Sequence, residues 1–260
     1  MRTESGLATM INPSKFNANY RIGFNGLMPD NSVGLPQLIT HVQEASLFHT
    51  KSIPGAFEFY EKMSWVWVLT HWQAEITAYP KVGDKINIAT WPVRFKSYFG
   101  ERGFEATDAD GKTLLAANSN WILLDRKTLK PVRPTEEIAQ KYGAYFPFKL
   151  EKNFTMPVFD GFAPLSAHSY TPTRRDIDTN KHVNNAKYLE WVFCYVPDEI
   201  YADYRPISLK VAYKKETLLG DNLEIKLFQR NNNNDVEILA IVEKDGKTAT
   251  EIYTAWRKNE

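Results

Sequence analysis

The densest run of polar and ionisable residues in this chain lies at positions 174–188, where Asp178, Asn180 and His182 occupy alternate positions. An imidazole has an intrinsic pKa of about 6.5, so His182 can take up and return a proton near neutral pH. The Asn180 amide can hold a water molecule or a carbonyl oxygen, and the Asp178 carboxylate can orient its neighbours. The pattern therefore predicts an acid–base site.

A buried helix is expected directly after this run. It extends from about Asn184 to Pro197, which ends a helix because proline lacks the N–H group. Apolar residues cover most of its circumference, which is typical of a helix inside a core. A second helix is predicted from Pro36, a residue suited to a first helical turn. Its apolar residues at helical spacing are Leu35, Leu38, Ile39, Val42, Ala45 and Phe48.

An internal repeat relates the two helical regions. Three segments recur in order 135 to 137 positions later: Gly83-Asp84 as Gly220-Asp221, Asp110-Gly111-Lys112-Thr113 as Asp245-Gly246-Lys247-Thr248, and Trp121 as Trp256. Each Asp-Gly pair predicts a type I′ hairpin between strands. We therefore predict an α+β protein with two similar halves, each an antiparallel sheet wrapped around a long central helix.

The repeat provides an internal control for the polar run. Asn184 or Thr179 can cap a helix, because the first backbone N–H groups lack partners within the helix. Capping does not account for Asp178, Asn180 and His182 together. The corresponding segment of the first half, residues 30–36, starts a helix without any histidine. This difference favours one catalytic half and one half kept for binding.

Proline content sets the predicted boundaries. Residues 131–172 hold six of the fourteen prolines. We assign residues 1–130 to the first half, 131–165 to a linker and 166–260 to the second half. Within the linker, a short helix is expected from Thr135 to Tyr142.

Composition excludes several classes of protein. The net charge of +1 gives no overall field for nucleic acid or an anionic membrane. A single cysteine excludes an intrachain disulfide, and no His-x₃-His pair or cluster of carboxylates favours a metal site. No apolar run approaches the roughly 18–20 residues that a membrane span needs. The first residues contain no signal segment or transit peptide, so we expect a cytoplasmic protein.

The polar run resembles the hallmark of acyl-ACP thioesterases, which are tandem hot-dog enzymes of plants and bacteria. The matching residues are Asp178-x-Asn180-x-His182-Val183-Asn184-Asn185-x-Lys187-Tyr188, Trp191, Ile88-Ala89-Thr90-Trp91 and Tyr213-Lys214-Lys215-Glu216. The resemblance spans roughly Tyr20 to Trp256 and implies a tandem hot-dog fold. The lack of a transit peptide suits a bacterial member.

The resemblance implies a catalytic set of Asp178, Asn180, His182 and Glu216, with no metal and no cofactor. Alternation along the strand that ends near Tyr213 would place Glu216 on the opposite face, so its role depends on the resemblance alone. Plant members often carry a cysteine directly after this glutamate, whereas this chain has Thr217. Cys194 follows His182 by twelve positions, too far along a helix for a nucleophilic pair, and is expected to be a small buried residue.

The expected reaction is hydrolysis of acyl-ACP to free fatty acid. Its partner would be an acyl carrier protein with a phosphopantetheine-linked acyl chain, and we allow for a homodimer. The alternatives are an acyl-CoA thioesterase and a non-catalytic acyl-binding hot-dog protein. Basic residues near the site suit either a solvated face or docking of an acidic carrier: Arg174, Arg175, Lys181, Lys187, Lys210, Lys214 and Lys215.

The first half lacks the polar run and is predicted to hold the acyl chain. We expect the chain to contact the helix face of Val42, Ala45 and Phe48, together with Trp65 and Trp67. The four histidines outside the run are assigned core or surface positions: His41, His49, His71 and His168.

Overall fold

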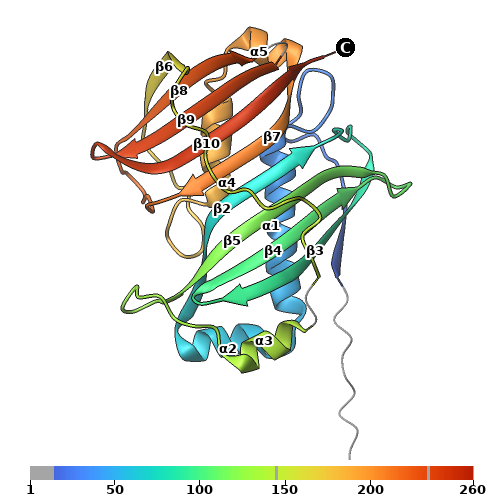
Figure 1. Cartoon of the computed structure of the whole chain (residues 1–260), viewed down its shortest axis with the longest axis vertical. Helices are drawn as coiled ribbons and strands as arrows, with labels where there is room; N and C mark the ends of the chain where they lie inside the picture. The colour runs from blue at the N-terminus through green and yellow to red at the C-terminus, as the bar shows by residue number, and fades with distance from the viewer. Residues whose placement is uncertain (1–14, 144–145, 233–234, 260) are drawn as a thin grey trace, which may run out of the picture.

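One ten-stranded antiparallel sheet runs through the whole chain, and two helices lie along one face of it (Figure 1). The computed structural model describes residues 15–143, 146–232 and 235–259. The first half holds β1 (Phe16–Arg21), α1 (Leu35–Ser52), α2 (Ala56–Met63), β2 (Trp65–Ile76), β3 (Lys85–Lys96), β4 (Phe99–Thr107), β5 (Thr113–Asp125) and α3 (Glu136–Tyr142). The second half holds β6 (Ala163–Tyr170), α4 (Asn185–Phe193), α5 (Asp198–Asp203), β7 (Tyr204–Tyr213), β8 (Leu223–Asn232), β9 (Asp235–Lys244) and β10 (Lys247–Lys258).

The strand order confirms the predicted repeat. It is β1-β3-β4-β5-β2-β7-β10-β9-β8-β6, so each half uses the same order counted from its own edge of the sheet. The halves join where β2 pairs with β7, from His71 opposite Ala212 to Glu75 opposite Ser208. The fold is therefore the α+β tandem hot-dog, with both sheets merged into one.

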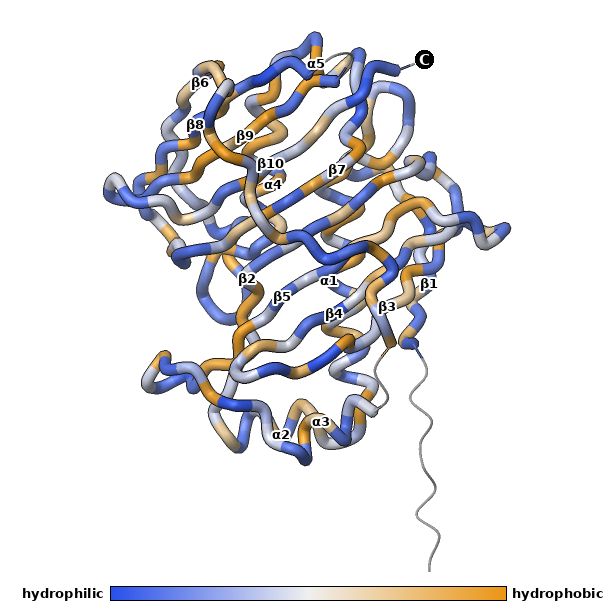
Figure 2. Tube along the Cα trace, in the orientation of Figure 1, coloured by the Kyte–Doolittle hydropathy of each residue, from blue (hydrophilic) through white to orange (hydrophobic). Residues whose placement is uncertain are grey.

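The central helices bury apolar faces against the sheet, and hydrophobic residues recur along the strands that they cover (Figure 2). Helix α1 begins at Leu35 after Gly34, with proline in its first turn as expected. Its buried stripe continues from Ala45 to Ser46 and His49. Phe48 falls outside this stripe and is exposed, so its assignment to the core face is wrong.

Helix α4 is shorter than expected. It ends at Phe193, and Tyr195 N–H donates to Val192 O in a tighter final turn. Proline disfavours helical geometry at the residue before it, so Pro197 affects the chain already at Val196. The second half therefore has a central helix of nine residues.

Only one of the two predicted hairpin turns is of type I′. Asp245 and Gly246 both have positive φ, at 52° and 68°, and directly join β9 to β10. In the first half, the side chain of Asp108 accepts hydrogen bonds from the N–H groups of Asp110 and Lys112. This side-chain turn makes a longer loop in which Gly111 has positive φ and Asp110 does not.

The predicted short helix is confirmed as α3, and the Thr135 hydroxyl caps it by accepting from Ile138 N–H. Helices α2 and α3 lie together beside one end of the first half (Figure 1). Tyr60, Ile138 and Tyr142 form a small core there with Trp65 and Leu123. The segment assigned to the linker thus begins with a helix that packs on the first half. Within the described ranges, no helix is long and apolar enough to cross a membrane.

Candidate active site

Asp178, Asn180 and His182 lie in a tight hairpin that leads into α4. A bridge between Ile177 and Val183 closes it, and Asp178 N–H donates to His182 O at 2.8 Å. Lys181 has a φ of 68° at its tip. Asp178, Asn180 and His182 therefore share one hydrogen-bonded turn.

The Asp178 carboxylate organises this hairpin. Its Oδ1 accepts the N–H groups of Asn180 at 2.8 Å and His182 at 3.3 Å. Its Oδ2 accepts the Asn180 side-chain amide at 3.4 Å. Asp178 therefore holds the Asn180 side chain and the backbone of His182.

Glu216 lies beside His182, with Oε2 at 3.4 Å from His182 Nε2. Strand β7 ends at Tyr213, so strand alternation no longer applies three residues later. Val183 N–H donates to Thr217 O at 3.0 Å, which joins the loop after β7 to the loop before α4. The side chains of His182 and Glu216 are 43% and 53% exposed, and such a pair contributes at most about 1 kcal/mol to stability. Both side chains are therefore reachable from solvent, and their contact adds little to stability.

Buried Asp176 holds the start of the hairpin in place through hydrogen bonds to its carboxylate. It accepts from Thr173 N–H and hydroxyl, Tyr170 OH and Trp191 Nε1. Burial opposes ionisation, but the hydrogen bonds, chiefly from Thr173, outweigh it and hold the pKa of Asp176 below its usual value. Asp176 is not distinguished by its sequence pattern, and its hydrogen bond from Trp191 Nε1 holds the hairpin against α4.

The first half contains a hairpin with the same backbone bonds but without the aspartate and histidine side chains of the second half. Leu27 bridges Val33, Met28 N–H donates to Ser32 O at 2.8 Å, and Asn31 has a φ of 63°. Ser32 thus occupies the position of His182, and Met28 occupies that of Asp178. The backbone turn is common to both halves, so the turn itself does not require Asp178, Asn180 or His182.

Thr217 and Cys194 both face away from this chemistry. Thr217 is fully buried, and its hydroxyl is 2.7 Å from Tyr188 OH. Cys194 is exposed at the end of α4, so the expectation that it is buried is wrong. Lys187, Glu190 and Cys194 follow one another at helical spacing on the polar side of α4. Partial burial and the neighbouring Glu190 raise the pKa of the Cys194 thiol, which makes it a poor nucleophile.

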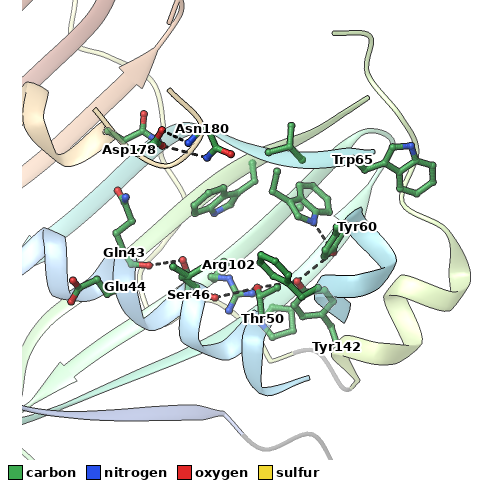
Figure 3. Close-up of a pocket in the computed structure, with 18 of the residues that line it drawn as sticks. Gln43, Glu44, Ser46, Thr50, Tyr60, Trp65, Arg102, Tyr142, Asp178 and Asn180 are labelled. Atoms are coloured by element: carbon green, nitrogen blue, oxygen red, sulfur yellow. Dashed lines mark hydrogen bonds between the residues drawn. The ribbon is translucent and has the colours of Figure 1, made fainter. Parts of the chain in front are cut away.

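A cavity of about 500 Å³ extends from the hairpin into the first half (Figure 3). Asp178, Thr179, Asn180, Asn184 and Asn185 line it from the second half. Helix α1 and strand β2 contribute much of the opposite wall, with Gln43, Glu44, Ser46, Leu47, Thr50, Trp65, Val66 and Trp67. His182 and Glu216 are not among the lining residues, so Asp178 and Asn180 connect the cavity to that pair.

The cavity uses a different face of α1 from the predicted one. Trp65 and Trp67 line it as expected, but Val42, Ala45 and Phe48 do not. Val42 and Ala45 are fully buried in the main core beneath the sheet. The apolar stripe of an amphipathic helix packs on its own sheet, which leaves the neighbouring mixed face with Ser46 and Thr50 for the cavity.

The cavity wall also contains a charged residue that is not among the predicted site residues. Arg102, on β4, is only 8% exposed and donates to His49 Nδ1 at 2.8 Å. Phe104 and Ala106 are buried on the same strand at intervals of two residues. Strand alternation from these two residues could have indicated an inward-facing charge.

No group of three or more His, Cys, Asp or Glu side chains that could hold a metal ion occurs within the part of the chain that the structure describes.

The fold and this hairpin place the chain in a known class. The family model for the acyl-ACP thioesterase N-terminal domain matches residues 13–142, and that for the C-terminal domain matches residues 163–258. The chain belongs to the acyl-ACP thioesterase family.

Individual relatives are distant. A chloroplastic acyl-[acyl-carrier-protein] hydrolase of Cuphea viscosissima is 26% identical over 77% of this chain and 52% of its own length. The chloroplastic palmitoyl-acyl carrier protein thioesterase of Arabidopsis thaliana is 27% identical, also over 77% of this chain and 52% of its own length. The chain spans about half the length of these curated relatives.

Solved structures agree on the fold. The 12:0-ACP thioesterase from Umbellularia californica superposes with a TM-score of 0.83 at 24% identity, covering 94% of both chains. An acyl-ACP thioesterase from Bacteroides thetaiotaomicron gives a TM-score of 0.79 at 23% identity, covering 93% of this chain and 97% of its own.

Proposed function

We propose that this protein hydrolyses acyl-ACP thioesters to free fatty acid and ACP, using Asp178, Asn180, His182 and Glu216. The contact between His182 and Glu216 carries the proposal, because it places two proton-transfer groups beside Asn180, a residue that lines a cavity. Membership of the acyl-ACP thioesterase family supports the choice of thioester and carrier.

In the proposed reaction, Glu216 and His182 remove a proton from a water molecule that attacks the thioester carbon. The side-chain amide of Asn180 donates to the oxygen that becomes negative. The Asn185 N–H, in the first turn of α4, has no acceptor among the described residues and can donate to the same oxygen. Collapse of the tetrahedral intermediate releases the phosphopantetheine thiolate, which His182 protonates.

Direct attack by the Glu216 carboxylate is the alternative first step. It would form an anhydride between Glu216 and the acyl group, and water would cleave that anhydride later. A burst of thiol ahead of free acid would indicate the covalent route, because the two products would then form in separate steps. Equal rates of appearance are expected for attack by water.

We assign the acyl chain of the substrate to the cavity, which is lined mainly by the first half. Trp65, Trp67 and Trp121 offer apolar surface along its wall. Asp178 and Asn180 border the same cavity, so a chain inside it would carry its thioester next to the hairpin.

The basic residues near the site separate into two groups. Lys187 pairs with Glu190, Lys214 pairs with Glu251, and Lys210 donates to Thr155 O. Exposed side chains that form no salt bridge with a described residue are Arg174, Arg175, Lys181 and Lys215. This second group supports docking of an acidic carrier protein, since its charges are available to a partner.

The test compares one acyl group on ACP, CoA and pantetheine. We expect the highest kcat/KM for acyl-ACP. Changing Arg175 and Lys181 together to glutamate should lower it about tenfold at low salt, without affecting acyl-pantetheine. Equal or faster turnover of acyl-CoA would favour the CoA enzyme. Binding of acyl chains without thiol release would favour a non-catalytic protein.

A homodimer and a cytoplasmic location stay predictions.

A further inference from the structure

The cavity wall contains a buried positive charge whose hydrogen-bonding capacity is only partly used. Arg102 donates through Nη1 to His49 Nδ1 at 2.8 Å and to Thr90 Oγ1 at 3.2 Å. Its Nε and Nη2 donate to no described residue, and neither is completely enclosed by protein atoms. Arg102 is one of the residues that line the cavity (Figure 3).

No carboxylate of a described residue pairs with this charge. Glu101 is the next residue on β4, but it pairs with Arg94 and Lys152, each at 2.7 Å. The other carboxylates of the cavity wall also have partners of their own: Glu44 contacts His41, Glu61 contacts Arg126, and Asp178 accepts from its own hairpin.

The groups around Arg102 do not supply a negative charge either. Burial and the charge of Arg102 lower the pKa of His49 to about 3, so this histidine is neutral. Tyr142 presents its ring to the guanidinium at 5.8 Å. The Tyr142 hydroxyl already lies within hydrogen-bond distance of Thr50 and Tyr60, and Trp67 Nε1 donates to Tyr60 at 2.7 Å.

Arg102 belongs to the part of the cavity away from the hairpin. Along α1, Gln43 bonds to Asn184 beside the hairpin, whereas Thr50 bonds to Tyr142. The seven residues between Gln43 and Thr50 correspond to a rise of about 10 Å. A chain whose thioester lies next to Asn180 would therefore bring its middle or distal carbons to the polar group of Arg102 and Tyr142.

A plain alkyl chain is a poor match for that position. Its methylene groups would exclude water from the three N–H bonds of Nε and Nη2 and give no acceptor in return, which is unfavourable. An oxygen atom at the same point would accept from Nε or Nη2.

We propose that Arg102 binds an oxygen atom carried by the acyl chain, so that preferred substrates have a hydroxyl, keto or carboxylate oxygen away from the thioester. This inference rests on the proposed thioesterase function and names the substrate class for that site.

The test measures kcat/KM of the wild-type protein for paired acyl-pantetheine thioesters over a series of chain lengths. Each pair has the same number of chain atoms and differs only by an oxygen substituent at the distal part. We expect at least one hydroxy, keto or carboxy substrate to exceed its saturated partner by about tenfold to a hundredfold, as for one hydrogen bond to a charged group. If every saturated substrate is turned over as well as its partners, the inference is wrong. If no thioester of the panel, on pantetheine or on ACP, is cleaved, the proposed function fails instead.

Arg102→Met should abolish the preference for oxygen, and Arg102→Lys should keep part of it by retaining the charge. Arg94→Met is the matched control, because Arg94 is an exposed arginine that pairs with Glu101 and does not line the cavity. Pantetheine carries no phosphate, so a preference on this carrier cannot come from a phosphate bound at Arg102. An effect of Arg102→Met that occurs only with phosphorylated carriers, equal for saturated and oxygenated chains, would overturn the inference.

Discussion

Gln43 in α1 and Asn184 at the start of α4 are joined by a side-chain hydrogen bond of 3.2 Å across 141 positions of sequence. Asn184 Oδ1 also accepts from Ala186 N–H, which fixes this oxygen as the atom that faces Gln43 Nε2. Gln43 Oε1 is consequently a buried acceptor without a partner among the described residues. Both residues line the cavity, so the contact connects the proposed acyl site of one half with the hairpin of the other.

Gln43→Met should lower kcat/KM for acyl-ACP about fivefold to tenfold while thermal stability changes little. The substitution removes one hydrogen bond, worth about 1 kcal/mol, that holds the helix start beside the substrate. Gln37→Met is the control, since Gln37 contacts His41 on the same helix outside the cavity. Equal kinetics for both variants would show that the contact serves only to join the halves.

Cys194→Ala should keep nearly all activity. The thiol is exposed at the far end of α4, about 14 Å along the nine-residue helix from the hairpin, and its raised pKa disfavours the thiolate. Thiol release from acyl-ACP is the measurement. A loss of about a thousandfold with an unchanged circular dichroism spectrum would mean that the Cys194 thiol is the nucleophile and that the proposed reaction is wrong.

Val66→Phe should shift the preferred acyl chain towards shorter lengths. Val66 lines the cavity, and each methylene that no longer fits costs about 0.8 kcal/mol, or roughly fourfold in kcat/KM. Val68→Phe is the matched control, because Val68 lies two residues along the same strand, is exposed and does not line the cavity. Identical length profiles for the two variants would place the acyl chain elsewhere.

Buried His49 should make the protein less stable in acid. Burial and the nearby Arg102 lower its pKa to about 3, whereas an unfolded histidine titrates at about 6.5. Below that unfolded pKa only the unfolded state takes up the proton, so this stability is present above about pH 6.5 and is lost as the pH falls towards 3. The loss is about 1.4 kcal/mol per pH unit.

Urea unfolding at pH 6.5 and pH 5 measures this effect. The wild type should lose about 1.7 kcal/mol more than His49→Gln over that interval. His168→Gln serves as the control, since His168 stacks on Tyr195 beside β6 and is only half-buried. If the free energy of unfolding depends on pH in the same way in the wild type and in His49→Gln, His49 is not the source of this acid sensitivity.

The sequence predicts those features that depend on local pattern. The recurring Gly-Asp and Asp-Gly segments give the repeat, and the apolar stripe from Leu35 to Ala45 gives α1. Glu216 could not be placed in this way, because a backbone hydrogen bond from Val183 to Thr217, not strand alternation, sets its position.

The errors have a common physical origin. Cys194 lies on the polar side of α4 with Glu190, and Phe48 lies off the stripe of α1, so both depend on where a helix face ends. Ser46 and Thr50 line the same cavity as the hairpin of the other half, which is distant from them in sequence. Asp176 and Arg102 acquire their roles from hydrogen bonds with other elements of their own half, with Trp191 on α4 and with His49 on α1 respectively.

The most direct test of the proposed chemistry is kcat for thiol release from a saturated acyl-ACP by His182→Ala and Glu216→Gln, with Ser32→Ala as the control. Ser32 occupies the position of His182 in the hairpin of the first half, so its change perturbs an equivalent turn without the proposed chemistry. We predict that kcat falls about 10²-fold to 10⁴-fold for the first two variants, with unchanged melting temperatures, and stays near the wild-type value for Ser32→Ala. Near-normal turnover by His182→Ala or by Glu216→Gln would contradict the assignment of that residue to the reaction.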